Sequence, residues 1–346
     1  MSETSQNAQR WRAKVTRSGV VEILEEAAAE LGATEARVSM RIAGVCGSDT
    51  HAYHGRHPQM SIPYYPGHEV VGVVEELGAE VTGLAVGTRV TPEPTLPCGT
   101  CKVCRAGHEN VCENLQFFGC GYREGGMAEN FTIPADRLRL VPDDLSDDQA
   151  ILIEPLATPV HAARLAGDLT GKVVLIHGCG TIGLLMLAAA RAAGAGRIVM
   201  SDLLPAKREV ATRLGADATI DAASATFVDD AIAALGETAD VVFDCVSIQS
   251  TVSASTAIVS KAGTVVIVGV PARPVEIDLP TVQDRQITVQ GAATYVREDY
   301  ETAIEIIRSG AVDPSVMLSS RFPYTRTQEA FDLAATGAEI KVVVTA

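Results

Sequence analysis

The sequence is short of positive charge. Its 346 residues include 28 Lys and Arg against 43 Asp and Glu, which gives a formal net charge of −15 at pH 7. A balance of this sign repels both the phosphates of nucleic acids and anionic lipid headgroups. We therefore expect neither nucleic acid nor a membrane surface among the partners of this chain.

The sequence also lacks a long uninterrupted hydrophobic segment. The first residues, MSETSQNAQRWRAK, carry charges and amides instead of the apolar core of a secretory signal. Residues 173–190 run for 18 residues without a formal charge, about the lower limit for a spanning helix, but a histidine and three glycines interrupt them. We expect a strand, a turn and a helix there, and a cytoplasmic location for the protein.

Length and patterning predict two domains, because 346 residues exceed the roughly 100–200 of a usual single domain. Short β-rich runs separated by Gly and Pro fill residues 18–150, although residues 22–31 have the composition of a helix and stay open. From 158 to 292, apolar strands alternate with Ala-rich helices, which is typical of a parallel α/β sheet. The last segment combines a helical pattern, REDYETAIEIIRSG, with a β-like run, EIKVVVTA. We predict a mostly-β domain from residues 1–157 and 293–346, and an α/β domain from 158–292.

Four cysteines form the most specific motif, Cys98-x2-Cys101-x2-Cys104-x7-Cys112. Cytosolic thiols are usually reduced, and four thiolates within 15 residues suit a tetrahedral zinc ion with no open position. Four unrelated free cysteines are one alternative. An iron–sulfur cluster is another, but bacterial ferredoxin runs continue x3-C-P, whereas seven residues intervene here and no proline follows Cys112. The motif favours a structural zinc site.

A second motif, Gly178-Cys179-Gly180-Thr181-Ile182-Gly183, lies between an apolar strand and a helix. Its three glycines would permit a tight turn, an approaching pyrophosphate and close packing of the helix. Asp202 follows nineteen residues after Gly183 and would bind a ribose 2′-hydroxyl while repelling a 2′-phosphate. This favours NAD over NADP, although Lys207 and Arg208 lie nearby. The alternative is a glycine-rich turn that binds nothing.

Three dispersed residues complete the chemistry: Cys46 in GVCGSDTH, His68 in PGHEVVG and Glu154 in LIEPLAT. Each alone has an ordinary interpretation as a core or solvated residue. Together, a thiolate, an imidazole and a carboxylate can hold a zinc ion and leave a position for water or substrate. The set is therefore a candidate for a catalytic zinc site.

These motifs, in this order, resemble those of zinc-dependent medium-chain alcohol dehydrogenases, in the polyol (sorbitol) dehydrogenase-like branch. The resemblance spans about residues 38–292 and, more weakly, the tail. It implies a GroES-like catalytic domain and a Rossmann NAD-binding domain, with the active site between them. It also marks Glu69 as an extra zinc ligand or exchange partner, so whether Glu69 or Glu154 binds zinc directly stays open. Asp49 resembles the residue that orients the zinc-bound imidazole.

The resemblance implies further roles. Ser48 and His51 resemble a proton relay. The implied cofactor contacts are Thr158, Gly178, Gly180, Thr181, Ile182, Gly183, Asp202, Arg208, Val268 and Val270. Edge strands such as TVVIVGV, or its neighbour, would pair in a homodimer or homotetramer. Phe117 is either a wall of the substrate pocket or a core residue, and Cys120, Cys179 and Cys245 match no ligand spacing, so we interpret them as structural.

The predicted activity is hydride transfer between NAD and a secondary alcohol or ketone of a polyol, sugar or cyclitol, with two zinc ions per chain. An amino alcohol of the threonine type or a small diol is the alternative substrate. A zinc-free double-bond reductase would lack Cys46 and His68. A non-catalytic dinucleotide-binding protein would keep only the structural zinc.

Overall fold

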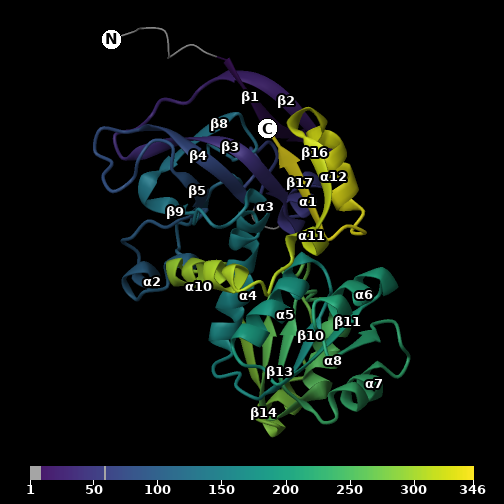
Figure 1. The fold of residues 1–346 in the computed structure, drawn as a ribbon. Coiled ribbons are helices and arrows are strands. Elements are labelled where there is room, and N and C mark those ends of the chain that lie inside the picture. Colours follow the sequence, from purple (N-terminus) through teal and green to yellow (C-terminus); the bar gives the residue numbers. More distant parts are fainter. Residues whose placement is uncertain (1–8, 58–59) are drawn as a thin grey trace. The chain divides into compact units, whose positions relative to one another are not determined.

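The computed structural model describes residues 9–57 and 60–346, which fall into two compact units (Figure 1). Unit 1 comprises Met1–Glu154 and Met317–Ala346, and unit 2 comprises Pro155–Val316. From the sequence we predicted domain boundaries after residues 157 and 292, and the corresponding domain ranges remain a prediction. Helix α10 (Arg297–Arg308) lies in unit 2, where its Asp299 accepts hydrogen bonds from His161 and Arg164 of α4 (Ile153–Leu165).

Unit 1 is built on a mostly antiparallel sheet with strand order β16-β17-β3-β4-β5-β9, in which β8 also pairs with β3. The central strand β3 (Glu35–Val45) buries Val38, Met40 and Ile42. The C-terminal strand β17 (Lys341–Thr345) pairs with β3, so the end of the chain belongs to this unit. Unit 1 also contains β4 (Val70–Leu77), β5 (Arg89–Pro92), β6 (Thr95–Leu96), β7 (Gln116–Phe117), β8 (Asn130–Pro134), β9 (Leu138–Leu140), β16 (Leu318–Pro323), α1 (Gly47–Tyr53), α2 (Lys102–Arg105), α3 (Asp147–Ala150) and α12 (Thr327–Ala335). The short helix α11 (Pro314–Met317) lies mostly in unit 2 and ends at the first residue of the second segment of unit 1.

Residues 22–31, which the sequence left open, begin as a strand. β2 (Val20–Ala27) pairs antiparallel with β1 (Gln9–Arg17) across a turn at Gly19, whose φ of +76° suits glycine. Val21 is buried, and Ile23 packs on the core of the unit. Packing and cross-strand pairing here override the helix propensity of the Glu- and Ala-rich sequence.

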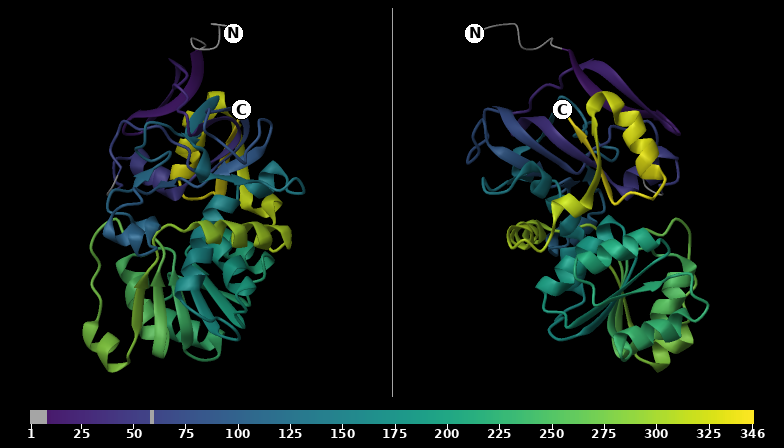
Figure 2. Two further views of the ribbon diagram at one scale, coloured as in Figure 1. Left: turned by 90° about the vertical axis from the view of Figure 1, so that its left-hand side faces the viewer. Right: turned by 45° about the vertical axis from the view of Figure 1, so that its right-hand side comes forward.

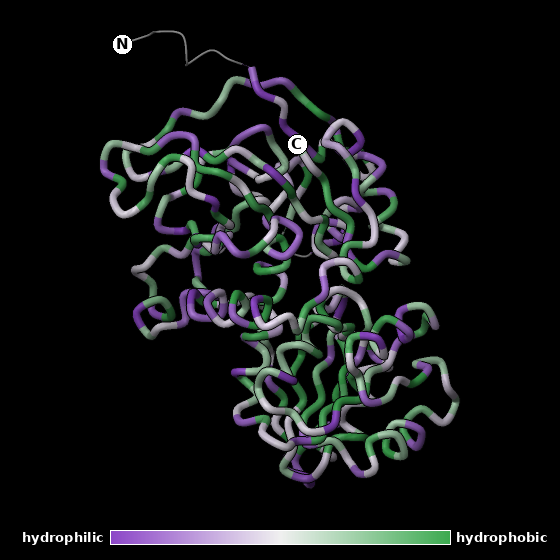
Figure 3. Tube along the Cα trace, viewed as in Figure 1, coloured by the Kyte–Doolittle hydropathy of each residue, from purple (hydrophilic) through white to green (hydrophobic). Residues whose placement is uncertain are grey.

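Unit 2 is a six-stranded parallel sheet, within the described residues, with order β12-β11-β10-β13-β14-β15. Helices cover both faces of this sheet (Figure 2), and its central strands are its most hydrophobic part (Figure 3). The first four residues of the TVVIVGV run end β14, which lies inside the sheet, and its neighbour β15 is the edge strand. The bounds are β10 (Val173–His177), β11 (Arg197–Asp202), β12 (Ala218–Asp221), β13 (Ala239–Asp244), β14 (Val259–Ile267), β15 (Thr288–Gly291), α5 (Thr181–Ala192), α6 (Pro205–Arg213), α7 (Phe227–Leu235), α8 (Gln249–Ile258) and α9 (Leu279–Asp284).

The structure confirms the strand, turn and helix predicted for the uncharged residues 173–190. They form β10, a glycine turn and the first part of α5. Across the described part of the chain, no helix combines the length and apolar character needed to cross a membrane. The strand order reverses between β10 and β13. In such sheets, ligands bind beyond the carboxyl ends of the strands at this switch point.

His177, at the carboxyl end of β10, predicts a pH dependence of stability. Burial lowers the pKa of His177 to about 4. Its Nδ1 lies 3.0 Å from Ser201 Oγ, and its Nε2 has no hydrogen-bond partner in the part of the chain that the structure describes. The unfolded chain takes up this proton below about pH 6.5, whereas the folded chain does so only near pH 4. Between pH 7 and pH 4.5 we therefore expect His177 to cost roughly 2–3 kcal/mol of unfolding free energy.

Urea unfolding of the wild type and of His177→Asn across this pH range measures that cost. Asparagine can keep a hydrogen bond to Ser201 but does not titrate, so the variant should lose less stability on acidification. Parallel pH profiles for the two proteins would refute the prediction.

Candidate metal and dinucleotide sites

The four cysteines of the loop after β6 converge in unit 1. Their four Sγ atoms all lie within 4.8 Å of one another, in Cys98, Cys101, Cys104 and Cys112. The Sγ atoms of Cys98 and Cys112 are 3.4 Å apart, and those of Cys101 and Cys112 are 3.9 Å apart. Sulfurs at the corners of a tetrahedron around zinc, about 2.3 Å from the metal, are about 3.8 Å apart. The cluster therefore fits a tetrathiolate zinc ion.

Backbone amides prepare these sulfurs to carry negative charge. The N–H groups of Cys98 and Asn114 point at Cys112 Sγ, both at 3.3 Å, and the N–H of Cys101 points at Cys98 Sγ at 3.4 Å. Hydrogen bonds from the Thr100 backbone and hydroxyl lower the pKa of Cys98 to about 5. The loop thus favours the thiolate, the form that binds zinc, at Cys98, whereas burial raises the pKa of Cys104 to about 12.

A second metal-ligand group in unit 1 contains Cys46, His68 and Glu69, whose ligand atoms all lie within 4.8 Å of one another. Cys46 directly precedes α1, and His68 and Glu69 directly precede β4. His68 and Glu69 are buried, at 3% and 0% exposure. A Cβ on Gly44 would lie 2.0 Å from Glu69 Oε2, so the bare backbone at residue 44 makes room for this carboxylate.

The buried Glu69 carboxylate has a partner that the sequence analysis missed. Lys341 Nζ, from β17, donates hydrogen bonds to both carboxylate oxygens at 2.7 and 2.6 Å. Lys341 is itself 2% exposed. Burial alone would lower the pKa of Lys341, but the negative charges of Glu69, Cys46 and Glu154, together with the hydrogen bonds to Glu69, outweigh this effect, so the pKa of Lys341 is raised. A single lysine within the otherwise apolar run IKVVVT was the available signal.

The other predicted residues of this site also belong to unit 1. Glu154 is buried at the start of α4 but is not in the group of three found among the described residues. Ser48 is half-buried and His51 is exposed, and the two lie three positions apart on α1, hence on one face of that helix. Asp49 is fully buried, and its Oδ2 accepts a hydrogen bond from the Cys46 N–H at 3.0 Å.

Unit 2 carries the glycine turn between β10 and α5. Gly178 has a φ of +94°, and a Cβ on Gly183 would lie 1.9 Å from the Gly178 carbonyl oxygen. These two glycines are therefore required by the turn itself. Gly180 caps α5, and a Cβ there would meet nothing within 4 Å. The N-terminus of α5, where Thr181, Ile182 and Gly183 begin the helix, thus has open space for a pyrophosphate.

Asp202 ends β11 next to this turn. Its Oδ2 accepts a hydrogen bond from Cys179 N–H at 2.8 Å, and its Oδ1 accepts one from Leu204 N–H at 2.9 Å. The Arg208 guanidinium donates to the carbonyl oxygens of Asp202 and Leu203 and lies 3.5 Å from Asp221. Arg208 therefore stabilises the loop after β11, and the Asp202 carboxylate stands at the turn as a fixed negative charge.

The remaining predicted cofactor residues occupy the same unit. Thr158 is on α4, and Val268 and Val270 follow the carboxyl end of β14, where Val268 is buried and Val270 is 56% exposed. The N–H groups of Val268 and Gly269 donate to the Asp244 carbonyl oxygen, both at 2.9 Å. Val268 and Gly269 therefore lie at the carboxyl ends of the parallel strands, as the glycine turn does.

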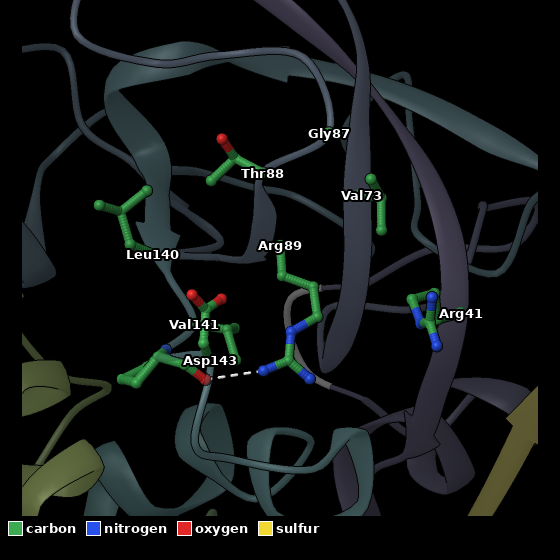
Figure 4. Close-up of a pocket in the computed structure, with 9 residues that line it drawn as sticks. Arg41, Val73, Gly87, Thr88, Arg89, Leu140, Val141 and Asp143 are labelled. Atoms are coloured by element: carbon green, nitrogen blue, oxygen red, sulfur yellow. Dashed lines mark hydrogen bonds between the residues drawn. The ribbon is translucent and has the colours of Figure 1, made fainter.

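Unit 1 also contains a cavity of about 660 Å³ (Figure 4). Arg89 donates to the Pro142 carbonyl oxygen at 2.7 Å and to Asp147, which also pairs with Arg41. The lining residues are Arg41, Val73, Gly87, Thr88, Arg89, Leu140, Val141, Pro142 and Asp143, and they include no predicted site residue.

Comparison with known proteins agrees with this geometry. Residues 32–143 match the alcohol dehydrogenase GroES-like domain, and residues 181–309 match the zinc-binding dehydrogenase family. The chain is 33% identical over 324 residues to L-idonate 5-dehydrogenase of Vitis vinifera, covering 90% of this chain and 88% of the relative. It is 30% identical over 322 residues to sorbitol dehydrogenase of Bombyx mori, covering 91% and 92%.

A solved structure extends the similarity to the whole fold. A zinc-binding dehydrogenase from Sinorhizobium meliloti, bound to NADP, superposes with a TM-score of 0.92 at 31% identity, covering 98% of this chain and all of that one. The predicted GroES-like domain and Rossmann-type parallel sheet are thereby confirmed. By fold, motifs and sequence similarity, the chain belongs to the zinc-dependent alcohol dehydrogenases, in their polyol dehydrogenase branch.

Proposed function

We propose that this enzyme transfers a hydride between NAD and a secondary alcohol or ketone of a polyol, sugar or cyclitol, with two zinc ions per chain. The observation that carries the proposal is the convergence of Cys46, His68 and Glu69 within 4.8 Å, in a unit that also holds a tetracysteine cluster. The first set is a mixed thiolate, imidazole and carboxylate group, which suits a catalytic zinc. The relatives named for idonate and sorbitol support the substrate class.

The donor set fits zinc because each member is a group that zinc prefers. Zinc bound by Cys46, His68 and a carboxylate would supply Lewis acidity, which lowers the pKa of a bound hydroxyl. Glu69 is the carboxylate in the group, and Lys341 neutralises its charge. Glu154 is the second candidate for this ligand. Substituting each glutamate by glutamine and counting bound zinc would tell the two apart.

Residues of α1 would handle the proton. The half-buried Ser48 would accept the hydroxyl proton, and the exposed His51, about one turn further along α1, would pass it to solvent. Asp49 anchors the start of α1 through the Cys46 N–H, which fixes the direction of the helix from the metal ligand onwards. Loss of this proton would let the carbinol carbon give up hydride and become a carbonyl, and NAD held by unit 2 would supply the hydride acceptor.

Residues of unit 2 would bind the dinucleotide. The open N-terminus of α5 would hold the pyrophosphate, and Asp202 would accept hydrogen bonds from the adenosine ribose. Thr158, Val268 and Val270 are our proposed contacts for the nicotinamide half. Because the Asp202 carboxylate is fixed beside the turn, a 2′-phosphate there would meet a like charge.

Cofactor preference gives a direct prediction. Like charges in close contact cost several kcal/mol, so kcat/KM with NAD should exceed that with NADP by at least about 100-fold. In Asp202→Asn, which removes the charge but keeps an acceptor oxygen, this ratio should fall by about tenfold or more. Initial rates with each cofactor at a saturating alcohol measure both ratios. Equal use of the two cofactors by the wild type would contradict the proposal.

The substrate class is tested with a panel of polyols, sugars, sugar acids and cyclitols, together with threonine and small diols as the competing classes. Reduced nicotinamide should form fastest with a member of the polyol, sugar or cyclitol set. A clear preference for threonine or for a small diol would replace the proposed substrate. Silence across the whole panel with both cofactors would oppose an alcohol dehydrogenase activity.

A further inference from the structure

The imidazole of His68 has a neighbour to which the sequence assigned no role. Cys120 Sγ lies 3.3 Å from His68 Nδ1, whereas the nearer Asp49 oxygen, Oδ1, is 3.8 Å from the same nitrogen. Ligand atoms of Asp49, His68 and Cys120 all lie within 4.8 Å of one another. The thiol is thus within hydrogen-bond distance of Nδ1, and the carboxylate is beyond it.

The carboxylate of Asp49 is only half satisfied. Its Oδ2 accepts the Cys46 N–H, but its buried Oδ1 has no hydrogen-bond partner among the described residues. A buried acceptor without a partner is energetically unfavourable. Cys120 Sγ lies within 4.8 Å of an Asp49 carboxylate oxygen and 3.3 Å from His68 Nδ1, so Cys120 and Asp49 both lie beside the imidazole.

The backbone places Cys120 here. Gly119 has a φ of +75°, and a Cβ on it would lie 2.6 Å from both Gly67 C and His68 N. The segment carrying Cys120 therefore runs directly against the segment carrying His68, and glycine is required for the approach. Phe117, two residues before Gly119, packs edge-on against the His68 ring at 5.7 Å and 74°. One short segment thus contacts the imidazole through two side chains.

Metal ligation requires one imidazole nitrogen to be free of a proton while the other donates its N–H to a neighbour. We infer that Cys120 is a positioning residue: its Sγ accepts the Nδ1–H of His68 and so leaves Nε2 for the metal. The inference rests on the proposed metal site at Cys46 and His68. It extends the interpretation of Cys120 as merely structural, and it gives Phe117 a place beside the ligand.

The test compares zinc release from the purified holoenzyme into a chromophoric chelator. Partners of metal-bound histidines typically contribute 10–100-fold to metal affinity. Cys120→Ala should therefore release one of its two zinc ions at least about tenfold faster than the wild type, with the other unchanged. Cys120→Ser, whose hydroxyl can also accept and donate, should stay within about threefold of the wild type. Cys245→Ala, a thiol deletion in unit 2, is the matched control.

Cobalt substitution gives a second readout. The visible absorption bands of cobalt at the Cys46 and His68 site should shift in Cys120→Ala and return towards the wild-type bands in Cys120→Ser. Retention of the tetracysteine zinc, together with an unchanged far-ultraviolet circular dichroism spectrum, shows that each variant is folded.

The outcomes separate the two proposals. If Cys120→Ala keeps both zinc ions and the cobalt bands of the wild type, this inference is wrong and the proposed function stands. If Cys120→Ser loses zinc as fast as Cys120→Ala, the hydrogen bond is not what Cys120 provides. If the wild type holds one zinc ion, at the four cysteines, both the proposed function and the role of Cys120 fall.

Discussion

Replacing Cys46 by alanine is expected to lower kcat/KM for alcohol oxidation by at least about 10³-fold. The Lewis acidity of a bound metal contributes several kcal/mol to such a step, and each 1.4 kcal/mol is about tenfold in rate. Cys46 is the thiol of the group that also contains His68 and Glu69. Without it, two of the three ligand types remain, and the variant should also lose one zinc ion per chain.

Steady-state rates with the best alcohol and NAD measure this effect. Binding of NADH, followed by its fluorescence, should survive in Cys46→Ala because the glycine turn and Asp202 lie in unit 2. Cys245→Ala controls for the removal of a thiol as such and should bind zinc like the wild type. A Cys46→Ala enzyme that kept more than about a tenth of its activity would show that Cys46 does not hold the reacting metal.

Replacing Lys341 by methionine is expected to lower the free energy of unfolding by about 3–5 kcal/mol. The substitution keeps the apolar length of the side chain but leaves Glu69 as a buried carboxylate without its cation. Breaking a buried pair in this way costs much more than the pair itself contributes, because the remaining charge stays out of water. Equilibrium unfolding of the chelator-treated, zinc-free protein in urea at neutral pH measures the loss without a metal charge beside Glu69.

A double substitution identifies the cause. Adding Glu69→Gln to Lys341→Met removes the stranded charge, so most of the lost stability should return. Lys261→Met, at an exposed lysine of unit 2, should change stability by less than about 0.5 kcal/mol. A loss below about 1 kcal/mol in Lys341→Met, the size typical of an exposed ion pair, would mean that Glu69 is solvated or neutral.

Local patterns made much of this protein predictable. The tetracysteine spacing and the glycine turn need only a few consecutive residues, so the four sulfurs and the strand–turn–helix lie where the sequence placed them. The alternation of apolar strands with helices was enough to predict the parallel sheet. These signals are short-range, and tertiary packing reinforces them.

Long-range contacts were harder to foresee. Lys341 and Glu69 are 272 positions apart, and neither spacing nor periodicity relates them. Cys120 is 52 positions from His68 and depends on the close approach at Gly119. Residues 22–27 form a strand because they pair with β1, a choice that their own propensities oppose. In each case the structure or contact is determined by a partner far away in the sequence, which the local residue pattern does not reveal.

The central claim is that two separate zinc ions are bound within unit 1. Crystals of the enzyme purified without chelators, measured on either side of the zinc absorption edge, test it most directly. We predict two anomalous peaks per chain, one among Cys98, Cys101, Cys104 and Cys112 and one in contact with Cys46 and His68. A single peak at the four cysteines, with none at Cys46, would contradict the account.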